Sequence, residues 1–323
     1  MVKNILITGG AGYIGSHISE VLIKTNKRIF ILDNLSTGHK RLINKKAKFI
    51  LGDITNKKII KKILKNYKID SVIHLAAALS VGESQKKPNK YKWINIEGTK
   101  RLLSSIYNSN VKNIIFSSTC AVYKDGSDNV SERSKLKPIS VYGKTKLVGE
   151  KLIKKFCKKN KINYGILRFF NVAGASSSGK VGQINKGDQL FKNFSLELNK
   201  KNPVFKVYGD DYNTKDGTCV RDYIHVSDIA KIHFEVLKKI NKINHSVIFN
   251  CGYSKGISVK EVIKEFKKNT RKKIIIKILK RRKGDMAKIT ANSSKLKKFI
   301  GWKPKNNNLN KIVKSCLYWE KKY

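Results

Sequence analysis

Short runs of mainly apolar residues alternate with longer stretches of helical pattern through the first half of this 323-residue chain. The runs are continuous, without alternation between apolar and polar residues, which is typical of strands in a parallel sheet covered on both faces. Strands and helices that alternate with short connections indicate an α/β fold built on a doubly wound parallel sheet. The predicted strands are residues 4–7, 29–32, 49–51, 71–75, 113–117 and 164–167, and the predicted helices are residues 16–24, 57–65, 91–108 and 142–158.

The pattern changes in the second half of the chain. Residues 172–187 are rich in Ser, Gly and Ala and predict a loop, and the elements beyond it are shorter and mixed. We therefore expect a first domain of residues 1–171 and a smaller mixed α/β lobe of residues 172–323. Part of 220–250 is expected to return to the first domain.

The charge of the chain is extreme, with 70 Lys and Arg against 22 Asp and Glu and a formal net charge of +48. Such a balance first suggests nucleic acid, because neutralising phosphates releases counterions. However, Lys recurs on nearly every predicted helix, and no zinc-finger or basic-zipper spacing appears. We therefore interpret the charge as solvated basic faces, which can attract anionic nucleotides. No specific nucleic-acid partner is expected.

The five cysteines are scattered and form no CxxC pair. This argues against a disulfide framework or a metal site and is typical of a reducing compartment. No apolar run approaches the roughly 20 residues needed to span a bilayer. We expect a cytoplasmic protein with no metal and no membrane partner.

Three glycines, Gly9, Gly12 and Gly15, follow the first predicted strand and open the first helix. In a Rossmann sheet, such glycines permit close approach of the backbone to a pyrophosphate, which the helix N-terminus then binds. Asp33 ends the second predicted strand, 18 residues beyond Gly15. Its carboxylate can bind ribose hydroxyls and would repel a 2′-phosphate, which favours NAD over NADP. Asp53, after the third strand, is either an adenine ligand or a helix cap.

Tyr142 and Lys146 form a YxxxK motif on a predicted helix, where residues four apart share one face. A nearby ammonium and a positive nicotinamide ring favour the phenolate, which is otherwise scarce at neutral pH. In a Lys-rich chain this motif alone would be chance. Thr119 strengthens it, because it follows a predicted strand at the carboxyl end of the sheet and can supply a hydroxyl to the substrate oxygen.

The order and spacing of these motifs resemble the extended short-chain dehydrogenases/reductases. Two further stretches, residues 168–175 and 208–226, resemble the UDP-glucose 4-epimerase family within that group, and the similarity runs over essentially the whole chain. The resemblance implies a homodimer that holds NAD and interconverts UDP-galactose and UDP-glucose. The reaction would pass through a 4-keto sugar by reversible hydride transfer.

The resemblance also implies roles for individual residues. The implied catalytic residues are Thr119, Tyr142 and Lys146. The implied NAD-binding residues are Gly9, Gly12, Tyr13, Ile14, Gly15, Asp33, Asn34, Asp53, Ile54, Ala76, Asn95, Ser117, Tyr142, Lys146 and Phe169. The implied substrate-binding residues are Thr119, Tyr142, Asn171, Gln189, Leu190, Tyr208, Arg221, Arg282, Asp285 and Ile289.

Two of these implications concern the substrate directly. Arg221 and Arg282 would clamp the diphosphate, because a guanidinium offers forked charge-assisted donors. Ile289 stands where members of the family restricted to plain hexoses have a large aromatic residue. It therefore either leaves room for the N-acetylated pair, UDP-GlcNAc and UDP-GalNAc, or is an apolar residue of a local strand.

The chain departs from the family pattern at four positions. Thr119 stands where Ser is common, Lys124 where Gly is common, Leu79 where Lys is frequent, and Gln189 where Asn or His is usual. None of these changes removes a catalytic atom.

Three alternatives have different sequence signatures. A 4,6-dehydratase of the same superfamily usually carries an Asp-Glu pair after the strand-end hydroxyl, where this chain has Cys120 and Ala121. A decarboxylase typically keeps a Glu at the second of these positions. A non-enzymatic NAD sensor commonly loses the Tyr or the Lys, and both Tyr142 and Lys146 are present.

Overall fold

A seven-stranded sheet forms the centre of the molecule, in the order β10-β6-β5-β4-β1-β2-β3. The computed structural model describes residues 3–185, 187–282 and 284–323. Every neighbouring pair in this sheet is parallel, which confirms the predicted α/β class. The strands are β1 (Asn4–Thr8), β2 (Arg28–Asp33), β3 (Lys48–Leu51), β4 (Ser71–His74), β5 (Asn113–Thr119), β6 (Asn163–Phe169) and β10 (Val247–Cys251).

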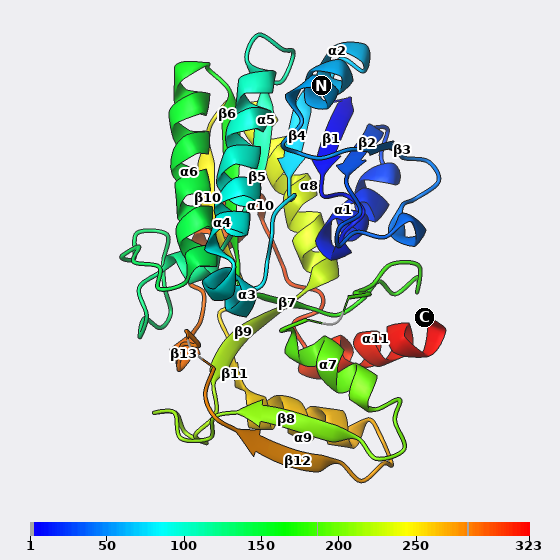
Figure 1. Ribbon diagram of the computed structural model, residues 1–323, viewed down its shortest axis with the longest axis vertical. Helices are drawn as coiled ribbons and strands as arrows, with labels where there is room; N and C mark the ends of the chain where they lie inside the picture. The colour runs from blue at the N-terminus through cyan, green and yellow to red at the C-terminus, as the bar shows by residue number, and fades with distance from the viewer. Residues whose placement is uncertain (1–2, 186, 283) are drawn as a thin grey trace.

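Helices cover both faces of this sheet, as Figure 1 shows. Successive side chains of β1 point to opposite faces. Ile5 and Ile7 therefore enter a core shared with α1 and α8, whereas Leu6 enters a core shared with α2, α5 and α6. These helices are α1 (Tyr13–Ile23), α2 (Lys57–Asn66), α5 (Gly98–Ile106), α6 (Val141–Lys159) and α8 (Val226–Ile243).

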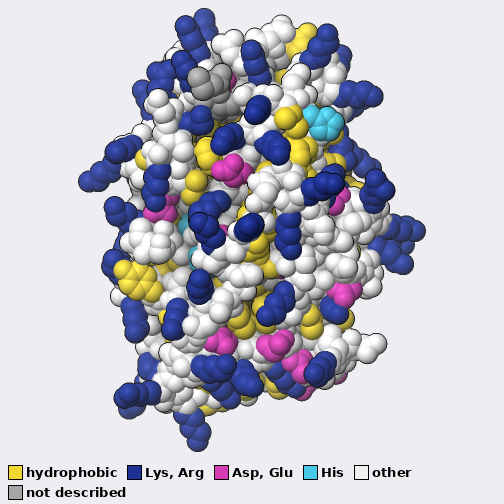
Figure 2. All heavy atoms as spheres, turned by 180° about the vertical axis from the view of Figure 1, so that it is seen from behind, with side chains coloured by type: hydrophobic (Ala, Val, Ile, Leu, Met, Phe, Trp, Pro, Cys, Tyr) yellow, Lys and Arg dark blue, Asp and Glu magenta, His cyan; other side chains and the backbone are white. Residues whose placement is uncertain are grey.

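The α2 helix shows how the basic surface arises. Its buried residues are Ile60, Ile63 and Leu64, while its lysines are exposed to solvent. The helix is amphipathic in the ordinary sense, with Lys filling the polar face. Figure 2 shows the same distribution on a larger scale, since Lys and Arg side chains are spread over the whole of the face it draws.

The predicted helix at 91–108 is interrupted in the structure. It consists of α4 (Pro88–Tyr91), a π-helical segment η2 (Lys92–Glu97) and α5. The π-helical turn carries the buried Asn95, whose amide hydrogen-bonds both Ala78 and Thr145. Such turns are rare and often lie at functional sites.

A smaller lobe lies beyond the carboxyl ends of the central strands (Figure 1). Its aromatic core includes Phe194 and Phe205, whose rings stack at 3.9 Å. Its sheets contain β7 (Asn171–Ala173), β9 (Val220–His225), β11 (Gly256–Ser258) and β13 (Lys288–Ile289), and separately β8 (Val204–Tyr208) and β12 (Ile275–Leu279). The remaining elements are α3 (Val81–Lys86), α7 (Leu190–Glu197), α9 (Val259–Lys268), α10 (Ser294–Ile300), α11 (Leu309–Lys322), η1 (Lys40–Leu42) and η3 (Cys120–Val122).

Within the three described stretches of the chain, no helix has both the length and the apolar character needed to cross a bilayer.

Candidate active site

The glycine loop makes a tight connection between β1 and α1. Gly9 has φ +72°, and a Cβ there would lie 2.7 Å from the backbone nitrogen of Ala76. A Cβ on Gly15 would lie 2.5 Å from the Gly9 carbonyl oxygen, so neither position accepts a side chain without movement. The α1 helix begins at Tyr13, with Gly12 as N-cap and no capping side chain. Its first N–H groups are therefore available to an anion.

Asp33 is held rigidly beside this loop. Its carboxylate accepts hydrogen bonds from the backbone nitrogens of Ala11, at 3.0 Å, and Leu35, at 2.8 Å. Burial raises the pKa of Asp33, and these backbone bonds oppose the rise. A Cβ on Gly38 would lie 2.7 Å from Asp33 Oδ1, so the neighbouring loop packs closely against the carboxylate.

Asp53 lies next to Asn34, whose side-chain amide donates to Asp53 Oδ2 at 2.6 Å. The other carboxylate oxygen accepts from the backbone and hydroxyl of Thr55. The helix-cap alternative for Asp53 is wrong, because Asn56 caps α2 with its own side chain. Asn34 and Asp53 therefore form one polar pair beyond the carboxyl ends of β2 and β3.

The remaining residues expected at the cofactor lie around the same edge of the sheet. Ser117 on β5 is buried, and its Oγ has no hydrogen-bond partner among the described residues, which leaves it available to a ligand. Ile54 and Phe169 are buried apolar residues, at 6% and 8% exposure. Together with the glycine loop and Asp33, these groups fit a dinucleotide.

The loop after β7 is tied to the same region. Tyr13 on α1 donates its hydroxyl to the Gly174 carbonyl at 2.6 Å. Ser176 and Ser178 both donate to the carboxylate of Glu20, also on α1. Further along the loop, Asn185 bonds the carbonyl of Thr37 and the ring of His39.

The structure brings Thr119 and Tyr142 together at the end of β5. Ser140 caps α6 by accepting from the Gly143 backbone nitrogen at 3.0 Å, which places Tyr142 in the first turn. Gly143 packs directly on the segment after β5, so α6 starts unusually close to it. Thr119 lies near enough to the Tyr142 phenol to lower its pKa, and Lys146 follows one helical turn later.

Of the two titratable groups of the motif, Lys146 is buried and Tyr142 is half-buried. Burial raises the pKa of Tyr142 to about 12, against an opposing effect of Thr119. Burial lowers the pKa of Lys146 to about 8, and Glu150 opposes that change. Lys146 Nζ lies 4.5 Å from the centre of the Phe116 ring. In the protein alone the phenol is protonated at neutral pH, so a further positive charge is needed before it can act as a base.

A cluster of charged and aromatic residues faces this set from the small lobe. Arg282 stacks over the Tyr208 ring at 4.8 Å and donates to Asp285 Oδ2 at 2.8 Å. Arg221, Arg282 and Asp285 all act on the pKa of Tyr223, so the three charged groups lie near one side chain. Burial is the largest influence on the pKa of Tyr223 and raises it.

The cluster lies close to the larger domain at two points. Arg221 acts on the pKa of Cys120, which directly follows Thr119. Asp188 acts on the pKa of Arg282 and accepts from Ser80 of the larger domain at 2.7 Å. The next two residues are Gln189, the N-cap of α7, and Leu190, its first residue.

Asn171 and Ile289 both lie on strands that pair with β9. Asn171 is opposite Tyr223 and is half-buried. Ile289 is opposite Arg221 and is fully buried in a cluster with Val122, Tyr123, Val130, Phe170 and Ala291. In this structure Ile289 therefore contacts packed apolar side chains.

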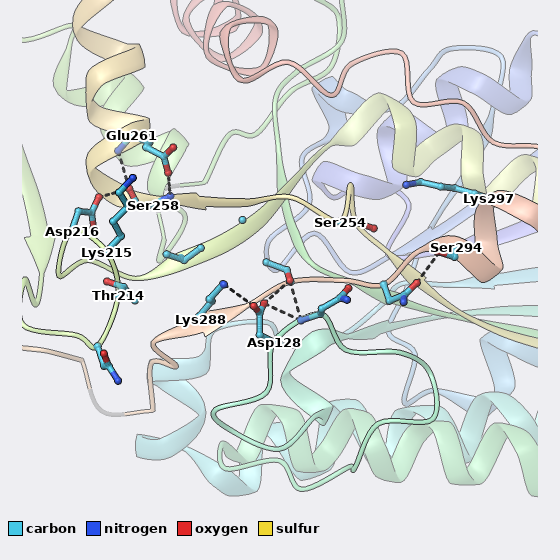
Figure 3. A pocket seen from close by; sticks show the side chains of 16 residues that line it. Asp128, Thr214, Lys215, Asp216, Ser254, Ser258, Glu261, Lys288, Ser294 and Lys297 are labelled. Carbon is cyan, nitrogen blue, oxygen red and sulfur yellow. Dashed lines mark hydrogen bonds and ion pairs between the residues drawn. The ribbon is translucent and has the colours of Figure 1, made fainter.

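A large polar cleft lies elsewhere (Figure 3). It has a volume of about 1030 Å³, and its lining includes Asp128, Asp216, Ser258 and Lys288. Lys288 and Asp128 form an ion pair at 2.6 Å within it. None of the residues expected at the active site lines this cleft. Lys288 lines the cleft, whereas its neighbour Ile289 points to the opposite face of the small sheet.

One buried charged group on α6 was not predicted from the sequence. Glu150 is fully buried on α6 and pairs with Arg168 of β6 at 2.7 Å. Its spacing of four residues from Lys146 was a usable signal. A charged residue inside an otherwise apolar strand run, as at Arg168, was another.

The model of the NAD dependent epimerase/dehydratase family matches residues 5–252. This chain belongs to that family. The UDP-glucose 4-epimerase of Lactobacillus helveticus is 40% identical over 321 residues, which cover 99% of this chain and 97% of the relative. The family membership confirms NAD as the cofactor and the extended short-chain dehydrogenase/reductase type expected from the motifs.

Two solved epimerase structures show the same fold as this family member. UDP-glucose-4-epimerase from Stenotrophomonas maltophila, with bound NAD and formylated UDP-arabinopyranose, matches with a TM-score of 0.94 at 33% identity, covering 99% of this chain and 98% of that chain. The UDP-Glc/GlcNAc 4-epimerase from Campylobacter jejuni matches with a TM-score of 0.85 at 38% identity, covering 99% of this chain and 100% of that chain. Both matches extend over the small lobe as well as the central sheet.

Proposed function

We propose that this protein is an NAD-dependent UDP-sugar 4-epimerase that interconverts UDP-galactose and UDP-glucose. The observation that carries the proposal is the close packing of the start of α6 on the segment after Thr119, which brings Tyr142 to Thr119, with Lys146 one turn away on the same helix. This arrangement sits at the carboxyl ends of parallel strands, beside the glycine loop, where ligands bind in such folds.

In the proposed mechanism, Tyr142 is the acid–base group. When bound, NAD supplies reversible hydride acceptance at carbon 4 of the sugar. Tyr142 removes the proton from the 4-hydroxyl as the keto sugar forms, and returns it after the sugar has turned over. Thr119 positions the substrate oxygen against the phenol. Lys146 stabilises the phenolate by its positive charge.

The proposed cofactor contacts follow the positions described above. The glycines and the first turn of α1, including Tyr13 and Ile14, would hold the pyrophosphate. Asp33 would bind the adenosine ribose, and Asn34, Asp53 and Ile54 would surround the adenine end. Ala76, Asn95, Ser117 and Phe169 would line the side toward the nicotinamide. We accordingly assign residues 1–171 as the NAD-binding domain and 172–323 as the substrate lobe, with part of 220–250 in the first domain.

The proposed anchor for UDP is the charged cluster of the small lobe. Arg221 and Arg282 would bind the diphosphate, and Asp285 would bind the uridine ribose. Tyr208, Gln189 and Leu190 would line the uridine pocket, and Asn171 would contact the phosphates or sugar. Because the UDP part is held tightly and the sugar makes few contacts, the keto sugar can rotate in the pocket while the intermediate stays bound.

The dehydratase alternative is disfavoured by the residues after Thr119. Elimination of water needs proton-transfer groups there, and Ala121 offers none. Burial raises the pKa of Cys120 to about 11, so its thiol is a poor proton shuttle at neutral pH.

We also propose a cytoplasmic homodimer. In support of the dimer, Trp93 of η2 is 50% exposed and borders a shallow hollow lined by Ile96 and Lys100. Exposed aromatic residues of this kind favour protein–protein contact. The scattered, unpaired cysteines support a reducing compartment. Light scattering of the wild type and of Trp93→Lys should give a dimer and a weakened dimer, respectively.

The test of the function is a single conversion assay. Purified protein, carrying its bound NAD, should convert UDP-galactose to UDP-glucose without added reductant. Tyr142→Phe is the matched control, since it removes only the phenolic oxygen. A 4-keto-6-deoxy product would assign the protein to the dehydratases instead.

A further inference from the structure

A fully buried carboxylate lies directly behind the catalytic residues. Glu150 is on α6, four residues beyond Lys146 and eight beyond Tyr142, and has 0% exposure. Burying an ionised carboxylate is costly unless it is paired and hydrogen-bonded. The structure satisfies this requirement from two strands of the central sheet.

Three hydrogen bonds hold this carboxylate. Arg168 of β6 donates through Nε at 2.9 Å and through Nη2 at 2.7 Å, and Ser118 of β5 donates at 2.6 Å. Arg168 is itself 1% exposed and also donates to the Tyr123 hydroxyl at 2.9 Å. A forked pair of this kind fixes both position and charge. Glu150 is thus an immobile negative charge.

This charge acts on Lys146. Burial is the main influence on the Lys146 ammonium and lowers its pKa, whereas Glu150 raises it. Two further groups near Lys146, His74 and Phe116, are uncharged. His74 on β4 is held between Thr8 and Thr99, and burial lowers its pKa to about 3, so it is neutral. Phe116 on β5 contributes the face of its ring.

We propose that Glu150 is a positioning residue for the epimerase reaction: clamped by Arg168 and Ser118, it keeps Lys146 in its charged form at physiological pH. The inference rests on the proposed roles of Tyr142 and Lys146. Because Glu150 touches neither substrate nor cofactor in this scheme, it acts only through Lys146. The clamp matters because Arg168 and Ser118 fix the position of the carboxylate on α6.

The proposal predicts a specific change in pH dependence. In Glu150→Gln the negative charge is lost and the Arg168 guanidinium is left unbalanced, so Lys146 loses its proton at lower pH. The alkaline limb of kcat/KM should therefore move to lower pH by about 1 unit or more. In the NAD-bound protein, where the positive charge of the cofactor lowers the pKa of Tyr142, its tyrosinate absorbance, identified by difference against Tyr142→Phe, should appear at higher pH, because the stabilising ammonium is lost earlier.

Two further variants separate this role from a structural one. Glu320→Gln removes a comparable carboxylate, 4% exposed and paired with Lys192 at 2.6 Å in the small lobe. It should lower stability and leave the alkaline limb in place. If Glu150→Gln does not fold, Glu150→Gln with Arg168→Met removes both charges together, which buried pairs tolerate far better. The alkaline limb of kcat/KM of this double variant should also move to lower pH, by a smaller amount than in Glu150→Gln.

The outcomes distinguish the two proposals. Wild-type protein that does not convert UDP-galactose would contradict the proposed function, while the tyrosinate titration would still test the effect of Glu150. The positioning role would be overturned if the wild type is active and the alkaline limb of kcat/KM stays in place in every folded variant that lacks Glu150. A limb that moves equally in Glu320→Gln would do the same.

Discussion

Gly143 and Ala121 determine how closely α6 approaches the end of β5: a Cβ on Gly143 would lie 2.3 Å from the Ala121 carbonyl oxygen. That oxygen belongs to backbone and cannot swing away. The separation between Tyr142 and Thr119 therefore depends on the absence of a side chain at the next position along the helix.

Gly143→Ala should both destabilise the protein and reduce turnover. Overpacking of this kind costs about 1–3 kcal/mol, and displacement of α6 would lengthen the contact between Thr119 and Tyr142. Thermal unfolding and kcat measure the two effects. Gly82→Ala in α3 is the matched control, because its Cβ would have no neighbour closer than 3.9 Å. Unchanged activity in Gly143→Ala would show that the close approach is irrelevant to catalysis.

Tyr142→Phe should lower kcat by at least about 100-fold, the range for loss of a general acid–base. UDP-sugar binding should remain nearly intact, since the proposed anchors are Arg221, Arg282 and Asp285. Single-turnover kinetics and calorimetric binding test the two parts. Substantial residual turnover would mean that another group removes the proton.

Activity should fall as pH rises above about 8, where Lys146 loses its proton. The proposed mechanism needs the Lys146 ammonium, which is present below this pKa and absent above it. A kcat/KM profile of the holoenzyme measures the limb. Whatever activity Lys146→Arg retains should not decrease in this alkaline range, because the guanidinium stays protonated. A limb that persists in Lys146→Arg would assign the titration to another residue.

Asp33 should exclude NADP. In direct titration the wild type should bind NAD and not NADP, because the carboxylate repels a 2′-phosphate. Asp33→Asn removes the charge while keeping an acceptor for the Ala11 or Leu35 backbone. Its NAD affinity should fall by about 1.5–3 kcal/mol, as for loss of a hydrogen bond to a charged group. Equal binding of both dinucleotides by the wild type would contradict this reading of Asp33.

Ile289→Tyr should suppress turnover of UDP-N-acetylgalactosamine more than turnover of UDP-galactose. The wild type is expected to accept both, since Ile leaves more room than an aromatic ring for the acetamido group. Parallel assays of the two substrates measure the selectivity. Because Ile289 is fully buried, equal loss of both activities would indicate a disrupted cluster instead of a closed gate.

The central sheet could be predicted from the sequence because its determinants are local. Each buried strand appears as a short apolar run, and β1, for example, extends only one residue beyond its prediction. The interruption at η2 was missed for the opposite reason. Asn95 is turned inward by partners near residues 78 and 145, and helical periodicity contains no information about such distant contacts.

The same limit applies to the candidate site. Tyr142 and Lys146 are four residues apart on one helix, so their proximity was predictable. The bond between Ser80 and Asp188 joins residues 108 positions apart, and the pair of Glu150 and Arg168 spans a helix and a strand. Such contacts depend on how the elements pack, which a single sequence does not reveal.

The loop after β7 gives the cofactor site a mechanical dependence on the rest of the chain. Tyr13 and Glu20 of α1, the helix whose N-terminus would face the pyrophosphate, are bonded to residues 174, 176 and 178 of that loop. Detaching the loop would remove these hydrogen bonds from α1, so we expect opening of the small lobe and release of the dinucleotide to be thermodynamically linked. By the same linkage, bound NAD should stabilise the small lobe against unfolding.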